Sequence, residues 1–299
     1  MRSRNALVLV VALTLGCGDK KADENSPAVN KPIETAEPTL VRVTGIPDEN
    51  PTELARSYKP LTDYLAEKLG AKVEYVPVTD YGAAVHALAA GKVDFAWLGG
   101  FTHVQSRNMT SVVPLVQRDI DRQFYSVFIA SKKSAIKNPG DLKGRTFAFG
   151  SKSSTSGHLM PRHFLTTVHK IDSDKDFDGK PVFSGAHDAT AKMVEEGKVA
   201  AGALNKQVWD RLVSEGKIET TKVDVIWTTP PYVDYVWTAR REVSEELREK
   251  FAQAFLALDP KTAAHQPILD RMGAKKYVRA TAADFDSIEA VGKQTGLLK

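Results

Sequence analysis

Short apolar runs alternate with longer amphipathic segments from Thr39 onward. The short runs are rich in β-branched and aromatic residues and predict strands at 40–43, 72–78, 93–97, 112–116, 125–130, 146–149, 199–204, 223–227 and 235–238. Apolar residues recur at helical spacing in 50–69, 81–90, 158–168, 188–196, 205–214 and 244–258. Asn50 can cap the first of these helices, with Pro51 at its first position. Strands that alternate with helices predict an α/β protein with mostly parallel sheets.

The N-terminus has the pattern of an export signal. Arg2 and Arg4 precede ten apolar residues, 6–15, which is about half the length that a membrane-spanning helix needs. Cys17 is the only cysteine and follows this run at the place where bacterial lipoproteins are processed. We expect residues 1–17 to be a lipoprotein signal peptide that leaves a lipid anchor on Cys17. A plain secretory signal with an incidental cysteine is the alternative.

The composition of the rest of the chain predicts a flexible linker followed by a globular part. Residues 18–38 contain three prolines and almost no large apolar side chain, which predicts a flexible linker. The 299-residue chain is 42% hydrophobic and 26% charged, enough to bury the core of one large domain or of two lobes. Its net charge of +4 falls to +2 without Arg2 and Arg4, because 39 basic residues then remain against 37 acidic ones. So small a charge does not favour nucleic acid or a membrane surface as a partner.

The stretch GSKSSTSG, at 150–157, follows the predicted strand 146–149 and combines five hydroxyl groups with two glycines. Pro161 has no amide hydrogen and fits only the first turn of a helix, so we expect the next helix to begin near His158 with Gly157 as its cap. Backbone amides before and within that first turn would then be free, and the helix dipole favours a negative charge there. The stretch predicts a cradle for an oxyanion. A solvated serine-rich loop with one capping serine is the alternative.

Other site patterns do not fit the sequence. His158 stands where a P-loop needs lysine, and no G-x-S-x-G hydrolase motif is present. Ser134 and Lys137 match S-x-x-K, but the accompanying S-D-N and K-T-G motifs are absent. The histidines lack the spacing of common zinc sites. We therefore expect no catalytic residue, no metal and no cofactor.

Four stretches together resemble the phosphonate and phosphite class of ABC-transporter substrate-binding proteins: Asp80-Tyr81, VDFAWLGG at 93–100, STSG at 154–157 and GAHD at 185–188. The resemblance extends from about residue 39 to 298. It implies an α/β, two-lobed periplasmic-binding-protein fold of type II, with mostly parallel sheets and a two-stranded hinge. It also implies a monomer that carries a small oxyanion (phosphonate, phosphite or similar) to an ABC permease in the membrane. A similar branch of the family has been associated with selenate.

The resemblance also assigns the ligand contacts, which fall on Tyr81, Tyr125, Ser154, Thr155, Ser156, His187 and Asp234. Phe124 could take the place of Tyr125. A carboxylate beside an oxyanion is repulsive unless a proton lies between them, so contact with Asp234 would favour a ligand that keeps an OH, near a second pKa of about 6, over selenate or sulfate. Alternatively, Asp234 pairs with His187 or an arginine and does not touch the ligand.

The expected organisation places 39–121 and 236–299 in lobe 1 and 122–235 in lobe 2. A ligand that bridges the lobes would favour their closure. The expected function is the substrate-binding component of a transporter, in the periplasm or at the cell surface, without catalytic activity and attached to the membrane only through Cys17. A sensor subunit with the same site, a site for selenate or selenite, and a secreted serine hydrolase are the alternatives.

Overall fold

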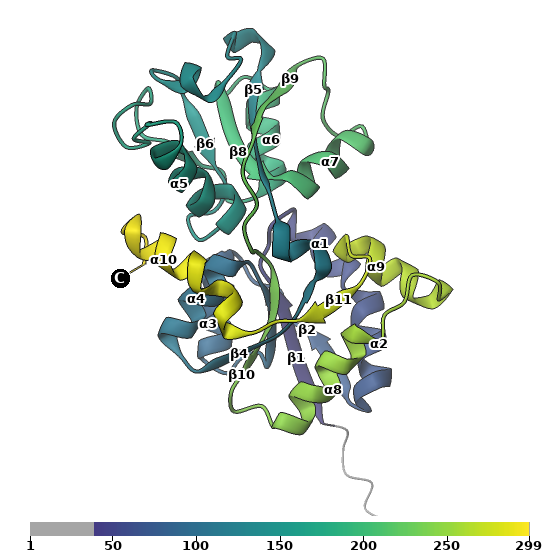
Figure 1. Ribbon diagram of the computed structural model, residues 1–299. Coiled ribbons are helices and arrows are strands. Elements are labelled where there is room, and N and C mark those ends of the chain that lie inside the picture. The colour runs from purple at the N-terminus through teal and green to yellow at the C-terminus, as the bar shows by residue number, and fades with distance from the viewer. Residues whose placement is uncertain (1–38, 299) are drawn as a thin grey trace, which may run out of the picture. The chain divides into compact units, whose positions relative to one another are not determined.

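The structure, a computed structural model, describes residues 39–298. The predicted signal peptide and linker, with Cys17, lie outside the described residues. The described part contains two sheets, each flanked by helices (Figure 1). We call the first sheet with its helices lobe 1 and the second sheet with its helices lobe 2; the residues at which the lobes join, 121/122 and 235/236, stay a prediction.

Lobe 1 is built on a six-stranded sheet with the order β11-β4-β10-β3-β1-β2. Its strands are β1 (Leu40–Gly45), β2 (Lys72–Tyr75), β3 (Phe95–Leu98), β4 (Val112–Arg118), β10 (Val236–Arg240) and β11 (Tyr277–Arg279). Its helices are α1 (Pro51–Ser57), α2 (Lys59–Leu69), α3 (Tyr81–Ala89), α4 (Gly100–Met109), α8 (Glu245–Leu256), α9 (Gln266–Met272) and α10 (Asp286–Gln294). Short 3₁₀ turns lie at Ala263–His265 and Ala282–Phe285.

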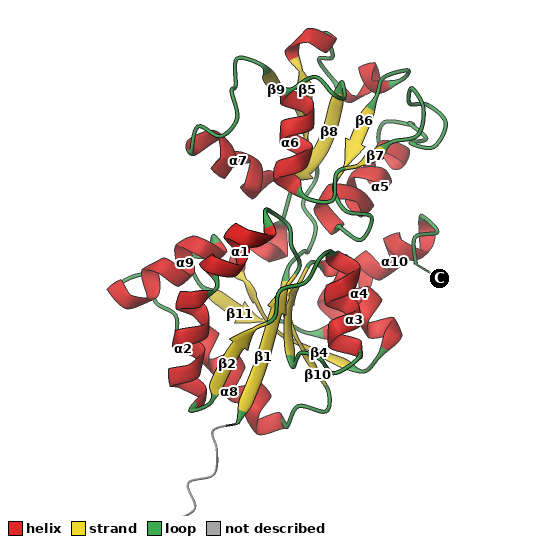
Figure 2. Cartoon of the chain, turned by 180° about the vertical axis from the view of Figure 1, so that it is seen from behind, coloured by secondary structure: helices red, strands yellow, loops and turns green. Residues whose placement is uncertain are grey.

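Lobe 2 is built on a five-stranded sheet with the order β7-β6-β8-β5-β9. Its strands are β5 (Ser126–Ser131), β6 (Phe147–Phe149), β7 (Val182–Phe183), β8 (Ala201–Asn205) and β9 (Val223–Thr228). Its helices are α5 (Met160–Thr167), α6 (His187–Glu195) and α7 (Lys206–Ser214), which lie on both faces of the sheet (Figure 2). A π-helical turn, Thr155–Leu159, precedes α5, and 3₁₀ turns lie at Lys132–Ser134 and Pro139–Leu142. A further 3₁₀ turn, Asp119–Gln123, lies where the chain leaves lobe 1 after β4.

Alternating side chains on β5 explain why lobe 2 has a core on each face of its sheet. Val127 and Ile129 belong to the core formed with α6 and α7, whereas Phe128 and Ala130 point to the opposite core, which contains Phe147. Successive side chains of a strand point to opposite faces. A strand buried on both faces therefore appears in the sequence as a continuous apolar run, as residues 127–130 do.

Strand pairing corrects the expectation of mostly parallel sheets. Among the described strands, four neighbouring pairs are parallel and five are antiparallel. The chain leaves lobe 1 after β4 and enters β5, and it later returns from β9 into β10. The outgoing strands β4 and β5 lie beside the returning strands β10 and β9, respectively. Each of these two pairs is antiparallel, because the chain passes between the lobes once in each direction.

The two crossings between the lobes are hydrogen-bonded to each other. Phe124 and Tyr232 exchange backbone hydrogen bonds of 2.7 and 3.0 Å, and the Asp234 amide donates to the Asp121 carbonyl at 2.9 Å. This pairing is the two-stranded hinge that the resemblance implies. It also places Asp234, near the end of the returning crossing, beside Gly100 at the beginning of α4.

Periodicity predicts the larger elements correctly and misses several short ones. Each of the nine predicted strand regions contains a strand, while β7, β11, α4, α9 and α10 were not predicted. The single helix expected at 50–69 is wrong, because the chain forms α1 and α2 with a break at Tyr58. Pro60 lies in the first turn of α2, where its ring and missing amide hydrogen prevent a continuous helix. Asn50 does cap α1, since its side-chain oxygen accepts the Thr52 amide at 3.0 Å.

Candidate anion-binding site

Four helices begin at one place between the lobes. Tyr81 opens α3 and Gly100 opens α4 in lobe 1, while Thr155 opens the π-helical turn and His187 opens α6 in lobe 2. The first amides of a helix have no partner within the helix, and its N-terminal end carries a partial positive charge. Their meeting point is therefore suited to a negatively charged group.

The serine-rich stretch forms the entry to α5, but in a register that differs from the expected one. The Ser154 Oγ accepts the Gly157 amide at 2.9 Å, so Ser154 is the cap and the turn begins at Thr155. The expectation that Gly157 caps a helix starting near His158 is wrong. The Leu159 amide donates to the Ser154 carbonyl at 3.0 Å, a bond that spans five residues and makes this turn π-helical.

Pro161 explains this register. It has no amide hydrogen to donate to the Gly157 carbonyl four residues earlier. That carbonyl instead accepts the Gly150 amide at 2.8 Å, which ties the two ends of the stretch together. A Cβ at Gly157 would stand 3.2 Å from the Gly150 Cα and 3.0 Å from the Ser154 Oγ, so the close approach favours glycine there. The glycines therefore serve a close backbone approach.

The three cradle side chains are all buried, each with at most 2% of its surface exposed. The Thr155 Oγ1 accepts the Phe101 amide of lobe 1 at 3.0 Å. The Ser156 carbonyl accepts a hydrogen bond of 2.7 Å from the Ser126 hydroxyl, which also lies 2.5 Å from the Tyr232 hydroxyl. Residues 154–156 are therefore not part of a solvated loop, and the Thr155 hydroxyl lies where the lobes meet.

Tyr81 enters the site from lobe 1. Its position is fixed by the preceding residue, since the Asp80 carboxylate caps α3 by accepting the Ala83 amide at 2.8 Å. The Tyr81 hydroxyl lies 3.4 Å from the His187 Nε2 across the lobes. Burial, with a smaller effect from Asp48, raises the pKa of Tyr81 well above its usual value, so the phenol keeps its proton and can donate it.

His187 faces Tyr81 as a neutral ring. Burial lowers its pKa to about 4, so it is uncharged at neutral pH. The Asn205 amide donates to the His187 Nδ1 at 3.3 Å, which leaves the ring hydrogen on Nε2. Nε2 points to the site and can therefore donate to an oxyanion. The His187 backbone amide donates to the Asp48 carbonyl of lobe 1 at 3.0 Å.

Asp234 is a buried carboxyl group that forms no ion pair with any described residue. Its Oδ1 accepts the Gly100 amide at 2.9 Å, and its Oδ2 has no partner among the described residues. Burial is the main reason that the pKa of Asp234 rises to about 7, partly offset by the hydrogen bonds from Gly100 and Thr155. The alternative in which Asp234 pairs with His187 or an arginine is wrong for the described part of the chain.

Tyr125 is less buried than the other six site residues. It is half-buried, and its side chain has no hydrogen bond or ring contact with any of them in the described structure. Phe124 is buried instead and packs against Tyr235, with ring centroids 5.5 Å apart, and against Tyr232 at 6.2 Å. A ligand contact by Tyr125 stays a prediction.

Sequence reasoning missed the beginning of α4. Gly100 and Phe101 supply the amides that reach Asp234 and Thr155. A Cβ at Gly99 would stand 3.0 Å from the Thr155 Oγ1 and 3.2 Å from the Asp234 Oδ1, so a larger residue would separate these groups. The signal was present in the sequence. Two glycines, Gly99 and Gly100, come one residue after the predicted strand 93–97, much as Gly150 follows the predicted strand 146–149.

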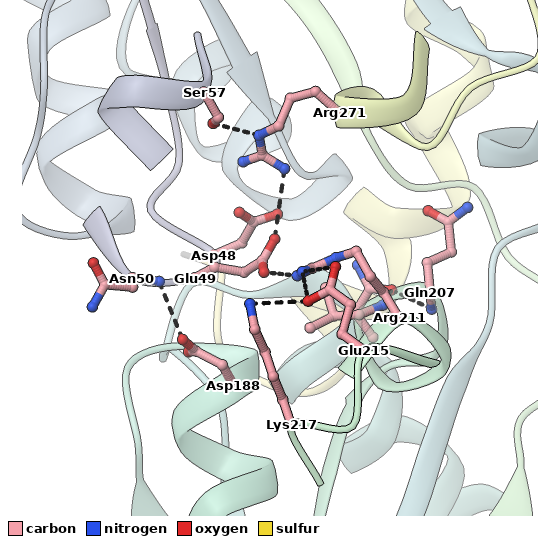
Figure 3. A network of polar contacts seen from close by, with 12 residues as sticks. Asp48, Glu49, Asn50, Ser57, Asp188, Gln207, Arg211, Glu215, Lys217 and Arg271 are labelled. Carbon is pink, nitrogen blue, oxygen red and sulfur yellow. Dashed lines mark hydrogen bonds and ion pairs between the residues drawn. The ribbon is translucent and has the colours of Figure 1, made fainter. Parts of the chain in front are cut away.

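Contacts between the lobes continue beside the site on the loop that follows β1 (Figure 3). The Asn50 amide donates to the Asp188 carboxylate at 3.2 Å. The Tyr235 hydroxyl donates to the Asp48 carboxylate at 3.0 Å. The Glu49 carboxylate forms ion pairs with Arg211 of lobe 2 and with Arg271 of lobe 1. The loop therefore fastens lobe 1 to the helices α6 and α7.

The described residues offer no group of three or more histidine, cysteine or acidic side chains that could hold a metal ion. Within residues 39–298, none of the helices combines the length and the apolar character that a membrane crossing requires. The site chemistry thus consists of amide, hydroxyl and imidazole donors and one carboxyl group.

Comparison with known proteins gives a family and several relatives. Residues 43–285 match the family described as the ABC transporter, phosphonate, periplasmic substrate-binding protein. A probable ABC transporter phosphite-binding protein, PhnD1 of Prochlorococcus marinus, is 37% identical over 88% of this chain and 92% of its own. The phosphate-import protein PhnD of Mycolicibacterium smegmatis is 29% identical over 72% of each chain. The crystal structure of the Prochlorococcus protein with methylphosphonate superposes with a TM-score of 0.83, at 35% identity, and covers 87% of this chain and 99% of that one.

Proposed function

The chain belongs to the phosphonate periplasmic substrate-binding protein family of ABC transporters, and we propose that it holds a small phosphorus oxyanion, phosphite or a short phosphonate, between its lobes and delivers it to a membrane permease. The observation that carries the proposal is the meeting of four helix N-termini at the buried Ser154, Thr155 and Ser156. The donors come from both lobes, so one anion can join them.

Asp234 favours a ligand that keeps a proton. When its carboxyl group is ionised, a P–OH group of the ligand can donate to the unpartnered Oδ2. Selenate and sulfate have no such proton at neutral pH, so they would face an unshielded negative charge whenever Asp234 is ionised, which its pKa of about 7 makes more frequent as the pH rises above neutrality. The relatives named above are phosphite, phosphonate and phosphate proteins, and the selenate association stays unconfirmed.

Catalysis has no support in the site. Among the described residues, no hydrogen bond joins the hydroxyl group of Ser154, Thr155 or Ser156 to a histidine, as a nucleophile and its base would require. We expect no turnover of ester substrates by the protein. The sensor alternative uses the same site and would need a membrane kinase in place of the permease.

Family membership places the domain outside the cytoplasm, in the periplasm or its equivalent. A lipid anchor on Cys17, beyond the described residues, and a monomeric state are further parts of the proposal. Replacing Cys17 by serine should move the protein from the membrane fraction to the soluble fraction. Continued membrane attachment of that variant would contradict the anchor.

Calorimetric titration tests the proposed ligand. We expect the purified protein to bind phosphite or methylphosphonate with micromolar affinity, about −8 kcal/mol, and to bind sulfate and selenate at least about tenfold more weakly. Thr155→Val keeps the side-chain shape but removes the hydroxyl, and should weaken binding about tenfold or more, since hydrogen bonds to charged groups contribute about 1.5–3 kcal/mol.

The matched control is Thr166→Val, an exposed position on α5 away from the cradle. It should bind like the wild-type protein. Absence of binding to every anion, or equal affinities for the two variants, would overturn the proposed site.

A further inference from the structure

A cavity lies directly beside the cradle. It has a volume of about 750 Å³ and is bounded by Phe101 and Leu297 of lobe 1 and by Lys152, Arg162, Lys180 and Phe183 of lobe 2. We call it the basic groove. The helices α4 and α10 of lobe 1 approach the π-helical turn of lobe 2 next to it (Figure 1).

The groove has an excess of positive charge. Lys152, Arg162 and Lys180 face one acidic lining residue, Asp174, which pairs with Arg162. Neither lysine has a carboxylate partner among the described residues. Two positive charges are thus left without a counterion at the edge of an anion site.

The cavity on the opposite side of the lobe contact has a different character. It measures about 310 Å³, and its charged lining consists of three arginines and four carboxylates, Arg118, Arg211, Arg271, Asp48, Glu49, Asp210 and Asp270. The net formal charge of the residues that line this cavity is therefore −1. Of the two cavities, only the basic groove is complementary to an anion.

The cation at Lys152 is held in place by its neighbours. The His158 Nδ1 bonds to the Lys152 carbonyl at 2.8 Å, and the Lys152 ammonium lies 5.5 Å from the centre of the Phe183 ring. The His158 ring itself packs edge-on against Phe183, with centroids 4.8 Å apart. The Lys152 backbone and side chain are thus positioned by the buried His158 and by the Phe183 ring that packs against it.

The groove also adjoins the cradle through shared residues. The side chain of Phe101 lines the groove, while its amide donates to the Thr155 Oγ1 of the cradle at 3.0 Å. Lys152 and Ser153 line the groove and directly precede Ser154. The contact between Phe101 of lobe 1 and Thr155 of lobe 2 therefore lies between the groove and the cradle.

We propose that the basic groove is an anion-collecting entrance, a weak second site that draws the small oxyanion toward the cradle before the lobes close. This inference rests on the proposed function and adds the route of entry. Charges at the mouth of a cleft raise the association rate of an oppositely charged ligand, and salt screens this effect. The groove therefore affects association more than it affects release from the closed cradle.

Stopped-flow measurement with phosphite or methylphosphonate tests the entrance. The double variant Lys152→Gln/Lys180→Gln should lower the association rate constant about 3- to 10-fold at low ionic strength, with a nearly unchanged dissociation rate constant. Near 1 M salt, where the Debye length is about 3 Å, the difference from wild type should disappear.

The matched control is Lys143→Gln/Lys175→Gln, which removes the same charge from lobe 2 at exposed positions paired with Asp176 and Asp172. It should associate like the wild-type protein. Equal association rate constants for the two double variants would overturn the proposed entrance, whether both constants are lower than that of the wild type or both equal to it. An equilibrium titration of the wild-type protein separates this failure from that of the proposed function, since loss of the entrance leaves wild-type binding intact. If the wild-type protein binds neither anion, the entrance fails together with the cradle.

Discussion

Burial of individual side chains sets the protonation states in this site. Tyr81 keeps its proton, His187 is neutral with its hydrogen on Nε2, and Asp234 titrates near neutrality. The first two present donors to an anion without carrying charge. Asp234 is the one carboxyl group among the proposed ligand contacts, and so it is the residue most able to distinguish a protonated anion from a fully ionised one.

Replacing Asp234 by asparagine should change that preference. The amide keeps the side-chain size but removes the negative charge, so sulfate and selenate should gain affinity relative to methylphosphonate, by about tenfold. Parallel titrations of the wild type and the variant measure the ratio. An unchanged ratio would mean that Asp234 does not face the ligand.

Asp234 should also affect the pH dependence of stability. Its pKa in the folded protein is raised from 3.8 to about 7, so the folded state holds a proton that the unfolded chain has already lost between these values. The resulting stability is present in full below about pH 4 and is lost as the pH rises to 7, by up to about 4 kcal/mol. Denaturant unfolding of wild type and Asp234→Asn from pH 4 to 8 should show the wild type losing stability relative to the variant as pH rises; parallel curves would contradict the raised pKa.

At the scale of elements, a glycine at the beginning of α4 allows the lobes to meet. Gly99 has an ordinary φ of −70°, so alanine fits its backbone, but a Cβ there would press on Thr155 and Asp234. Gly99→Ala should therefore weaken anion binding about tenfold while changing the unfolding free energy by less than about 1 kcal/mol. Titration and denaturant unfolding measure the two effects. Normal affinity in this variant would show that the contact between α4 and the cradle is not needed for binding.

At the scale of the whole molecule, the Glu49 ion pairs hold the lobes together away from the anion. Arg211 belongs to lobe 2 and Glu49 to lobe 1 (Figure 3). The Arg211 and Glu49 side chains are 33% and 17% exposed. A partly exposed pair contributes roughly 1 kcal/mol. Glu49→Gln should therefore shift the free protein toward an open form and weaken anion binding about fivefold.

Small-angle X-ray scattering without anion should show a larger radius of gyration for Glu49→Gln than for the wild type. Glu215→Gln is the matched control, because Glu215 pairs with the same Arg211 but belongs to the same lobe. If both variants scatter like the wild type, the pair does not hold the lobes closed.

The sequence by itself determined most of the elements and singled out the hydroxyl-rich turn 150–157 as the candidate cradle. Period-2 and period-3.6 patterns are local properties, and so are the capping side chain of Asn50 and the hydroxyl-rich turn after the strand 146–149. The tertiary structure alone decided which strands run antiparallel, the register of the helix that Pro161 enters, and the meeting of Gly100 with Asp234, 134 residues apart. It also decided that the Asp234 carboxyl group would have a pKa of about 7, because desolvation depends on which distant segments pack around a side chain, and no local pattern contains that information.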